Sequence, residues 1–449
     1  MPRFSCPSRR EFLVSGASAT GASALALATS TRRAHAARPV LRIAQWAHFV
    51  PAYDEWFDRK FTRAWGDRNG VTVEVDHLAL SEIRARADTE VATQQGHDLF
   101  ALPSSPVSYE PHVMPLTDVV TEAEHRFGKL PSFAHKSTFN PRTKQYFAVP
   151  ESWAPGLLHY RSDLWEETGT KPDTWELVRE GARKINEKRG IPAGFGLAPD
   201  PDSNMMLRSL IWAFGGAEQD EAGQVAINSP ATVEAVKLMA TVYRESLSSD
   251  VFMWDAASNN RAFVWGQASI IQNPISAIRS MEKGNPELAR KAMLAPAAAG
   301  PAGRFGPAHV VHCYVIWKFS DKGDLARRFL IDFLAAAGES LRASEFYNLP
   351  CFPRAVHALP RMIGAGNGGP AKKGASGSPP DRYGLLADAE RWSSARGHPG
   401  YFTPAIDETI GRGVIPAMFA RAARREQTPE ASVRAAEAEM RRIFGRWSR

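Results

Sequence analysis

The chain contains 449 residues, which is too long for one ordinary hydrophobic core and fits about two or three domains. Hydrophobic residues make up 44% of it and charged residues 23%, as in soluble globular proteins. The formal net charge is +7, but five arginines lie within the first 36 residues, so the rest of the chain is close to balanced. The sequence has no dense stripe of lysine and arginine, which argues against a nucleic-acid-binding protein.

The first 36 residues have the pattern of an export signal. Ser8-Arg9-Arg10-Glu11-Phe12-Leu13 is a twin-arginine motif, and Ala34-His35-Ala36 is a small-residue cleavage site. The weakly apolar run Phe12–Ala28 between them is too short and too polar to span a membrane. We therefore predict that residues 1–36 are a removed signal peptide, which the twin-arginine export machinery recognises through Arg9 and Arg10. The mature protein is then expected to be soluble in the periplasm.

Two cysteines, Cys313 and Cys351, remain after removal of this signal, and the periplasm permits disulfide formation. Both lie beside segments in which we expect the chain to cross between two halves of the protein, so they are candidates for a pair. Two isolated cysteines are also often buried as small hydrophobic residues. The sequence leaves both possibilities open.

Residues 40–102 alternate between strand and helix patterns. Strands are predicted at Leu41–Trp46, Val71–Val75 and Asp98–Leu102, separated by helices at about Tyr53–Arg68 and Ser81–Gln95. This βαβαβ order predicts a parallel sheet with helices on both faces. Ligands of such sheets bind at the carboxyl ends of the strands. Those ends carry Trp46, His48 and Ser104.

Residues 149–186 predict the first passage of the chain between two halves. Prolines hold Val149–Pro155 extended, and Leu157–Tyr160 has the pattern of a short buried strand. A helix with one apolar stripe follows from Trp175, with Asp173 as its expected cap. We interpret Val149–Pro155 as a crossing segment.

Two further crossings are predicted later in the chain. A strand at Gln267–Asn273 precedes a Gly/Pro-rich linker, an apolar strand returns at His309–Trp317, and Asn348–Pro353 is a third crossing. Helices are expected at Pro404–Arg421 and Pro429–Phe444. The predicted N-terminal lobe comprises residues 37–150 and 308–349. The C-terminal lobe comprises residues 151–307 and 350–449, with a flexible Gly/Pro-rich loop at 364–380.

Several motifs occur in the order found in one protein family. They are the Val149-Pro150 crossing, Arg161-Ser162-Asp163-Leu164-Trp165, Pro172-Asp173-Thr174-Trp175-Glu176-Leu177, Ile211-Trp212-Ala213-Phe214-Gly215-Gly216, Asn228-Ser229-Pro230-Ala231, Phe263-Val264-Trp265-Gly266-Gln267-Ala268 and Thr428-Pro429-Glu430-Ala431. From about residue 40 to residue 449 the chain resembles the extracellular solute-binding proteins of the sugar-binding family (family 1) that serve ABC importers.

This resemblance implies an α/β, two-lobed periplasmic-binding-protein fold of type II. Each lobe is expected to be a mainly parallel sheet flanked by helices, and a hinge of three crossings joins the lobes. The expected function is to capture a carbohydrate in the cleft between the lobes and to deliver it to the membrane permease of an ABC importer. The protein is then a monomer that catalyses no reaction and needs no cofactor.

Candidate ligand residues are those at the predicted strand ends and crossings. An indole ring can stack on the apolar face of a sugar, while carboxylate and amide groups bind its hydroxyls. The predicted ligand-binding residues are Trp46, His48, Ser104, Glu151, Trp153, Gln272, Asn273, His309 and Tyr347, with Trp212, Trp392 and Tyr401 as weaker candidates.

Other chemistry finds little support in the sequence. Gly364–Gly369 matches a dinucleotide-binding pattern but lacks the preceding strand and following helix, and Ser280-Met281-Glu282-Lys283 lacks the companion motifs of serine-lysine enzymes. His309 and His312 are three residues apart on a predicted strand, so they should point to opposite faces. We predict neither a metal site nor catalytic residues. The alternatives are an exported glycoside hydrolase, or a binding protein for a polyol phosphate or an organic cation.

Overall fold

The computed structural model describes residues 38–104, 107–357, 359–364 and 382–447. The predicted signal peptide with Arg9 and Arg10, and residues 365–380 of the predicted loop, lie outside these residues. Within the described ranges, no helix combines the length and the apolar character needed to cross a lipid bilayer.

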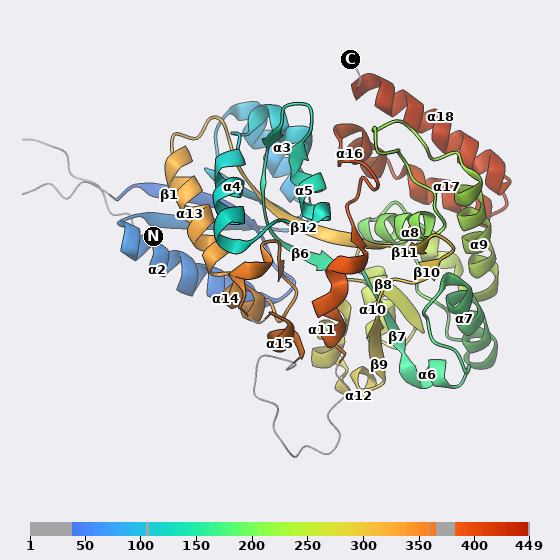
Figure 1. Ribbon diagram of the computed structural model, residues 1–449. Coiled ribbons are helices and arrows are strands. Elements are labelled where there is room, and N and C mark those ends of the chain that lie inside the picture. The colour runs from blue at the N-terminus through green and yellow to red at the C-terminus, as the bar shows by residue number, and fades with distance from the viewer. Residues whose placement is uncertain (1–37, 105–106, 358, 365–381, 448–449) are drawn as a thin grey trace, which may run out of the picture. The chain divides into compact units, whose positions relative to one another are not determined.

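A seven-stranded sheet follows the order β13-β6-β12-β3-β1-β2, with β14 paired to β12 (Figure 1). Strands β1 (Val40–Trp46), β2 (Thr72–Leu78) and β3 (Leu99–Leu102) are parallel, which confirms the predicted βαβαβ unit. Strand β12 (Gly306–Ile316) runs antiparallel to both β3 and β6 (Val149–Pro155). The short strands are β13 (Leu349–Pro350) and β14 (Ser393–Ser394).

The first helical segment begins two residues earlier than predicted and changes its geometry in the middle. A π-helix, η1 (Phe57–Thr62), joins α1 (Pro51–Trp56) to α2 (Arg63–Asn69). The apolar side of this whole segment packs against α13 (Gly323–Ala335). The ring centroid of Phe329 on α13 lies 5.0 Å from that of Trp65 on α2. The Trp65 indole also donates a hydrogen bond to Asp332 (2.8 Å). This segment therefore forms one aromatic layer of the core beside the sheet.

The other elements packed around this sheet are short. They are α3 (Ile83–Thr93), η2 (Val107–His112), α4 (Thr117–Phe127), α5 (Ser132–Thr138), β4 (Phe139–Asn140), β5 (Gln145–Tyr146), α14 (Ala337–Ala343), η4 (Pro353–Ala355) and α15 (Leu359–Gly364).

The second sheet has three strands in the order β8-β7-β9. Strands β8 (Ile270–Asn273) and β9 (Ala292–Ala295) are both antiparallel to the central β7 (Leu157–Arg161). The expectation of a mainly parallel sheet in each lobe is therefore wrong for this sheet. Apolar runs identify buried strands but carry no information about pairing direction.

Helices surround this second sheet. They are α6 (Ser162–Glu166), α7 (Trp175–Arg189), α8 (Pro201–Ala213), α9 (Pro230–Ser246), η3 (Ser249–Phe252), α10 (Ser258–Val264), α11 (Ser276–Gly284), α12 (Pro286–Ala289), η5 (Gly384–Trp392), α16 (Pro404–Gly411), α17 (Val414–Ala423) and α18 (Pro429–Trp447), with the hairpin β10 (Ala299–Gly300) and β11 (Gly303–Arg304). Thr174, and not Asp173, caps α7 by accepting a bond from the Leu177 amide. The predicted helix Pro404–Arg421 is divided by Gly413, which has a positive φ of 63°.

The chain passes from the first sheet to the second at Gly156, slightly later than the predicted boundary after Pro150, because all of β6 pairs in the first sheet. Its amide donates to the Pro307 carbonyl (3.0 Å), and a Cβ atom at Gly156 would lie 2.7 Å from Pro307 Cγ. Glycine is therefore required by close approach of two crossing segments. The division into the two lobes as drawn from the sequence stays a prediction.

Cys313 and Cys351 are both free thiols and both buried. Cys313 on β12 pairs with Pro150, while the Cys351 amide donates to Glu151 on the same central strand β6. Strands on either side of a third strand are about 9–10 Å apart, beyond the span of a disulfide. The sequence left open a disulfide or two separate buried cysteines, and the structure has two separate buried thiols.

Candidate functional site

Four rings meet at the carboxyl end of β1. We call Trp46, His48, His312 and Tyr347 the aromatic cluster. The Trp46 indole lies 4.8 Å from the His48 ring and 5.0 Å from the His312 ring, measured between centroids. Tyr347 meets His48 edge-on at 5.2 Å. The structure therefore brings together three of the predicted ligand residues and one, His312, that the sequence had not proposed.

Hydrogen bonds fix the tautomers of both histidines. The Val50 amide donates to His48 Nδ1 (2.9 Å), so the proton of His48 is on Nε2, which donates to Asn348 Oδ1 (3.1 Å). The Trp46 indole donates to His312 Nδ1 (3.2 Å), so His312 also carries its proton on Nε2. Two buried donors of these side chains, His312 Nε2 and Asn348 Nδ2, have no acceptor among the described residues.

Burial keeps both imidazoles neutral. It lowers the pKa of His48 to about 4 and lowers the pKa of His312 well below its usual value of 6.5. The aromatic cluster therefore offers ring faces and neutral hydrogen-bond donors and carries no positive charge near pH 7.

A second group of polar side chains joins β8, α8, α10 and β12. We call Asp202, Asn259, Asn273 and His309 the polar cluster. Asp202 accepts from the Asn273 amide (2.8 Å) and lies 3.0 Å from His309 Nε2. The Asn273 amide also contacts Asn259 Oδ1 (3.1 Å). Two predicted residues, Asn273 and His309, therefore converge on a carboxylate that the sequence analysis missed.

Tyr347 of the aromatic cluster is near Asp202 of the polar cluster. Burial raises the pKa of Tyr347, and the negative charge of Asp202 raises it further, so these two side chains lie within electrostatic reach. Beside the polar cluster, Gln272 Oε1 is buried without a donor, while its amide reaches Ser209 at a long 3.5 Å. A small hollow of about 10 Å³ is lined by Asp202, Asn259 and Gln272 among others.

Glu151 and Trp153 do not take part in either cluster. Strand β6 bulges at Glu151, because Pro150 pairs with Cys313 whereas Ser152 pairs with the next residue, His312. Opposed residues of adjacent strands share a face. Ser152 therefore faces the same side as His312, and Trp153, paired with Val311, faces the other.

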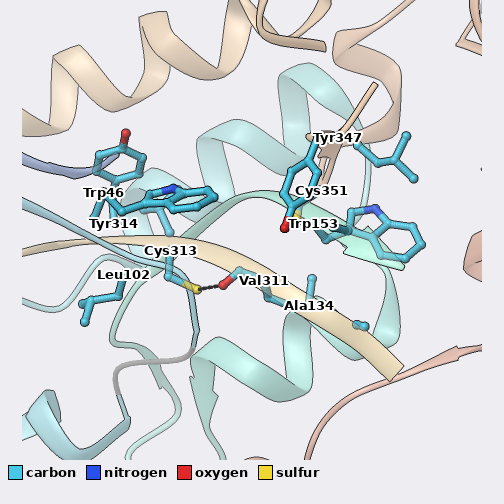
Figure 2. Close-up of a cluster of buried hydrophobic side chains, with 14 of the residues drawn as sticks. Trp46, Leu102, Ala134, Trp153, Val311, Cys313, Tyr314, Tyr347 and Cys351 are labelled. Carbon is cyan, nitrogen blue, oxygen red and sulfur yellow. Dashed lines mark hydrogen bonds between the residues drawn. The ribbon is translucent and has the colours of Figure 1, made fainter. Parts of the chain in front are cut away.

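Trp153 accordingly packs on α5, where its ring lies 4.5 Å from that of Phe133. Figure 2 shows Trp46 and Trp153 at separate positions along β12. The same view shows the hydrogen bond that the Cys313 thiol donates to the Val311 carbonyl (3.2 Å). Trp153, predicted as a ligand-binding residue, thus lies outside both clusters.

Glu151 lies in the hydrophobic core with its carboxylate accepting from Ser340 of α14 (3.2 Å). Burial raises its pKa to about 7. That Glu151 binds ligand hydroxyls stays a prediction, and its buried carboxylate is held by Ser340 in this structure.

The other candidates lie elsewhere or at the margin. Ser104 is two residues beyond β3 and half-buried. Trp212 is buried against His398, Trp392 fills the space beside Gly306, and the Tyr401 hydroxyl lies 3.3 Å from His135 Nε2. None of these three weaker candidates belongs to a cluster.

The residues that sequence reasoning missed had weak signals. Asp202 follows the helix-opening pair Asp200-Pro201, and Asp200 caps α8 by accepting from two backbone amides. Asn348 opens the predicted third crossing but was not proposed as a ligand residue. Among the described residues, no group of three or more His, Cys, Asp and Glu side chains is arranged to hold a metal ion.

Comparisons with known proteins agree with this fold. The family described as "Bacterial extracellular solute-binding protein" matches residues 58–356. A protein named "Probable ABC transporter-binding protein" from Deinococcus radiodurans is 23% identical over 265 residues, 55% of this chain. The chain spans 61% of the length of that relative. A binding protein of Brucella abortus is 21% identical over 320 residues, covering 70% of this chain and 75% of the relative.

Solved structures show the same architecture. Maltose-bound MalE3 of T. maritima has a TM-score of 0.71 at 21% identity and covers 90% of this chain and 99% of its own. A sugar transporter of Arthrobacter chlorophenolicus with bound laminaribiose has a TM-score of 0.72 at 13% identity and covers 90% and 99%. The predicted periplasmic-binding-protein fold is confirmed. The chain therefore belongs to the bacterial extracellular solute-binding protein family.

Proposed function

We propose that the protein captures a neutral carbohydrate between the aromatic cluster and the polar cluster and delivers it to the permease of an ABC importer. The observation that carries this proposal is the set of buried polar atoms without protein partners: His312 Nε2, Asn348 Nδ2 and Gln272 Oε1. His312 Nε2 and Asn348 Nδ2 lie in or beside the aromatic cluster, and Gln272 Oε1 lies beside the polar cluster.

A sugar matches this set chemically. A buried donor or acceptor left without a partner costs about 1–3 kcal/mol, and a hydroxyl group can satisfy either kind. The ring faces of Trp46 and Tyr347 suit the apolar face of a pyranose. Because His48 and His312 are neutral, the aromatic cluster has no charge with which to attract a phosphate.

The energy required is modest. Micromolar affinity corresponds to about −8 kcal/mol. Five to ten hydrogen bonds of about 1 kcal/mol net each, together with stacking, can supply this after the ordering costs of binding. The sugars named for the two solved structures, maltose and laminaribiose, support a carbohydrate as the ligand class.

The proposal includes export. Arg9 and Arg10 in the twin-arginine motif direct the chain to the periplasm, and cleavage near Ala36 releases the soluble protein. Replacing both arginines by lysine should retain the precursor in the cytoplasm, and fractionation with an antibody measures this. Unchanged periplasmic delivery of the double variant would contradict twin-arginine export.

Calorimetry over a panel of monosaccharides, oligosaccharides and polyols tests the ligand class. For a sugar that binds, Asn348→Ala should weaken affinity at least tenfold, which corresponds to about 1.4 kcal/mol. Asn228→Ala is the matched control, because Asn228 is exposed and its amide donates to Glu437 at the surface. Absence of binding by every sugar and polyol, with an unchanged melting midpoint, would contradict the proposal.

Two rival functions have distinct results. A glycoside hydrolase would release new reducing ends from oligosaccharides, which a solute-binding protein does not. A binding protein for an organic cation would use Asp202 as the counter-charge, and its affinity would fall steeply with salt, whereas binding of a neutral sugar would change little.

A further inference from the structure

A second cavity, of about 480 Å³, shares no lining residue with either cluster. Its walls come from η2, the β4–β5 hairpin, the turn at residues 221–225, the start of α16 and the end of α18. Its volume lies in the range of about 300–1,000 Å³ typical of small-molecule sites. It is therefore large enough for a ligand of its own.

Aromatic side chains dominate the inner wall. Phe147 and Phe402 are buried at its base, and the rings of Phe139 and Tyr401 lie 6.2 Å apart between centroids. Phe444 of α18 lines the same cavity. Rings in this arrangement favour a flat, apolar guest through stacked and edge-on contacts.

One cation at the rim stands out by its lack of an ion pair. Arg142 lines the cavity and is exposed, and it forms no salt bridge with any described residue. Three other charged residues line the cavity: Glu110 accepts two bonds from the Asn140 amide (2.7 and 2.8 Å), Arg441 pairs with Glu437 (2.7 Å), and Glu221 is exposed in the turn at residues 221–225. The guanidinium of Arg142 is thus available to a carboxylate, which it can bind through two parallel bonds.

We propose that this cavity binds a small planar aromatic carboxylate, with its ring packed against the Phe139–Tyr401 pair and its carboxylate on Arg142. This site is independent of the carbohydrate proposal, because the two regions have no residue in common. It also requires no reaction.

Calorimetry of the full mature chain with trans-cinnamate as the probe tests the site. Saturable binding of one cinnamate is expected, with the neutral analogue cinnamamide at least tenfold weaker because it cannot pair with a guanidinium. Arg142→Gln should weaken cinnamate at least tenfold and leave cinnamamide unchanged. Arg59→Gln is the control, since Arg59 is also exposed, lies on η1 and does not line the cavity.

A second variant tests the ring contacts. Tyr401→Leu should weaken cinnamate and cinnamamide by similar factors, and the melting midpoint shows whether the variant is folded. The proposal is overturned if cinnamate does not saturate, if the acid and the amide bind equally, or if Arg142→Gln has no effect. Titration of Arg142→Gln with a sugar that binds the wild type should give an unchanged affinity, which separates failure here from failure of the carbohydrate proposal.

Discussion

Replacing Glu151 by glutamine should make the protein more stable at alkaline pH. Glu151 is buried on the hinge strand β6, and its contacts with Ser152 and Ser340 only partly offset the loss of hydration. Burial raises its pKa from 4.5 to about 7. The ionised form is therefore disfavoured in the folded state, and a glutamine of nearly the same shape cannot ionise.

The sign and the size follow from linkage. A group whose pKa is raised by folding contributes stability that is complete below its unfolded pKa of 4.5 and is lost as the pH rises through about 7. The difference of about 2.5 units corresponds to about 3 kcal/mol at 1.36 kcal/mol per unit. The free energy of unfolding of Glu151→Gln minus that of the wild type should rise by about 2–3 kcal/mol between pH 5 and pH 8.5.

Urea unfolding at several pH values measures this difference, and subtraction of the wild type removes the titration of the other groups. Glu55→Gln is the control, because Glu55 is exposed on α1 and should give a difference that stays flat with pH. If the Glu151→Gln difference also stays within about 0.5 kcal/mol, the carboxylate is hydrated, and its assignment to the core is wrong.

Three further outcomes are expected. Glu218→Gln should lower the free energy of unfolding in urea by about 3–5 kcal/mol, because it leaves the fully buried Arg208 guanidinium, 2.7 Å from Glu218, without its counter-charge. Replacing both members of this ion pair by apolar residues should recover most of the loss. A cost below about 1 kcal/mol for the single variant would contradict this. Because burial lowers the pKa of His48 to about 4, the free energy of unfolding should fall as the pH falls from 6.5 toward 4. His48→Gln should make the free energy of unfolding from urea melts depend less on pH in this range. An unchanged pH dependence would refute this prediction. Cys313 and Cys351 should react with a thiol reagent only after unfolding, because burial raises the pKa of both thiols. Rapid labelling of both thiols in the native protein would contradict their burial.

The fold was predictable from local patterns in most places. The alternating strands and helices of residues 40–102 form as expected, and the stripe of Trp175, Val178, Ala182 and Ile185 on α7 is buried. The spacing of apolar residues along the chain indicates which side of a helix or strand is buried, and these elements form where that spacing is regular. It does not report pairing, so the antiparallel order of β8-β7-β9 was not foreseen.

The site was predictable only where position along a strand decides it. Trp46 and His48 follow from the carboxyl end of β1, and Asn273 from the end of β8. Asp202 and Asn348 come from a helix start and a crossing that have no chemical signature in the sequence, yet each bonds a predicted residue. Only the contacts between segments that are distant in the chain show that Asp202 and Asn348 belong to the candidate site.

The faces of the hinge strands depend on irregularities that composition does not reveal. In a regular β6, Glu151 and Trp153 would share one face, and Ser152 would take the other. The bulge at Glu151 breaks this alternation, and a second register shift on β12 falls between Ala308 and Val310. Because of that shift, His309 reaches Asp202 while His312, three residues later, reaches Trp46, although strict alternation would have pointed the two histidines to opposite faces. The shift on β12 thus explains how His309 and His312 each contact a residue of the two clusters.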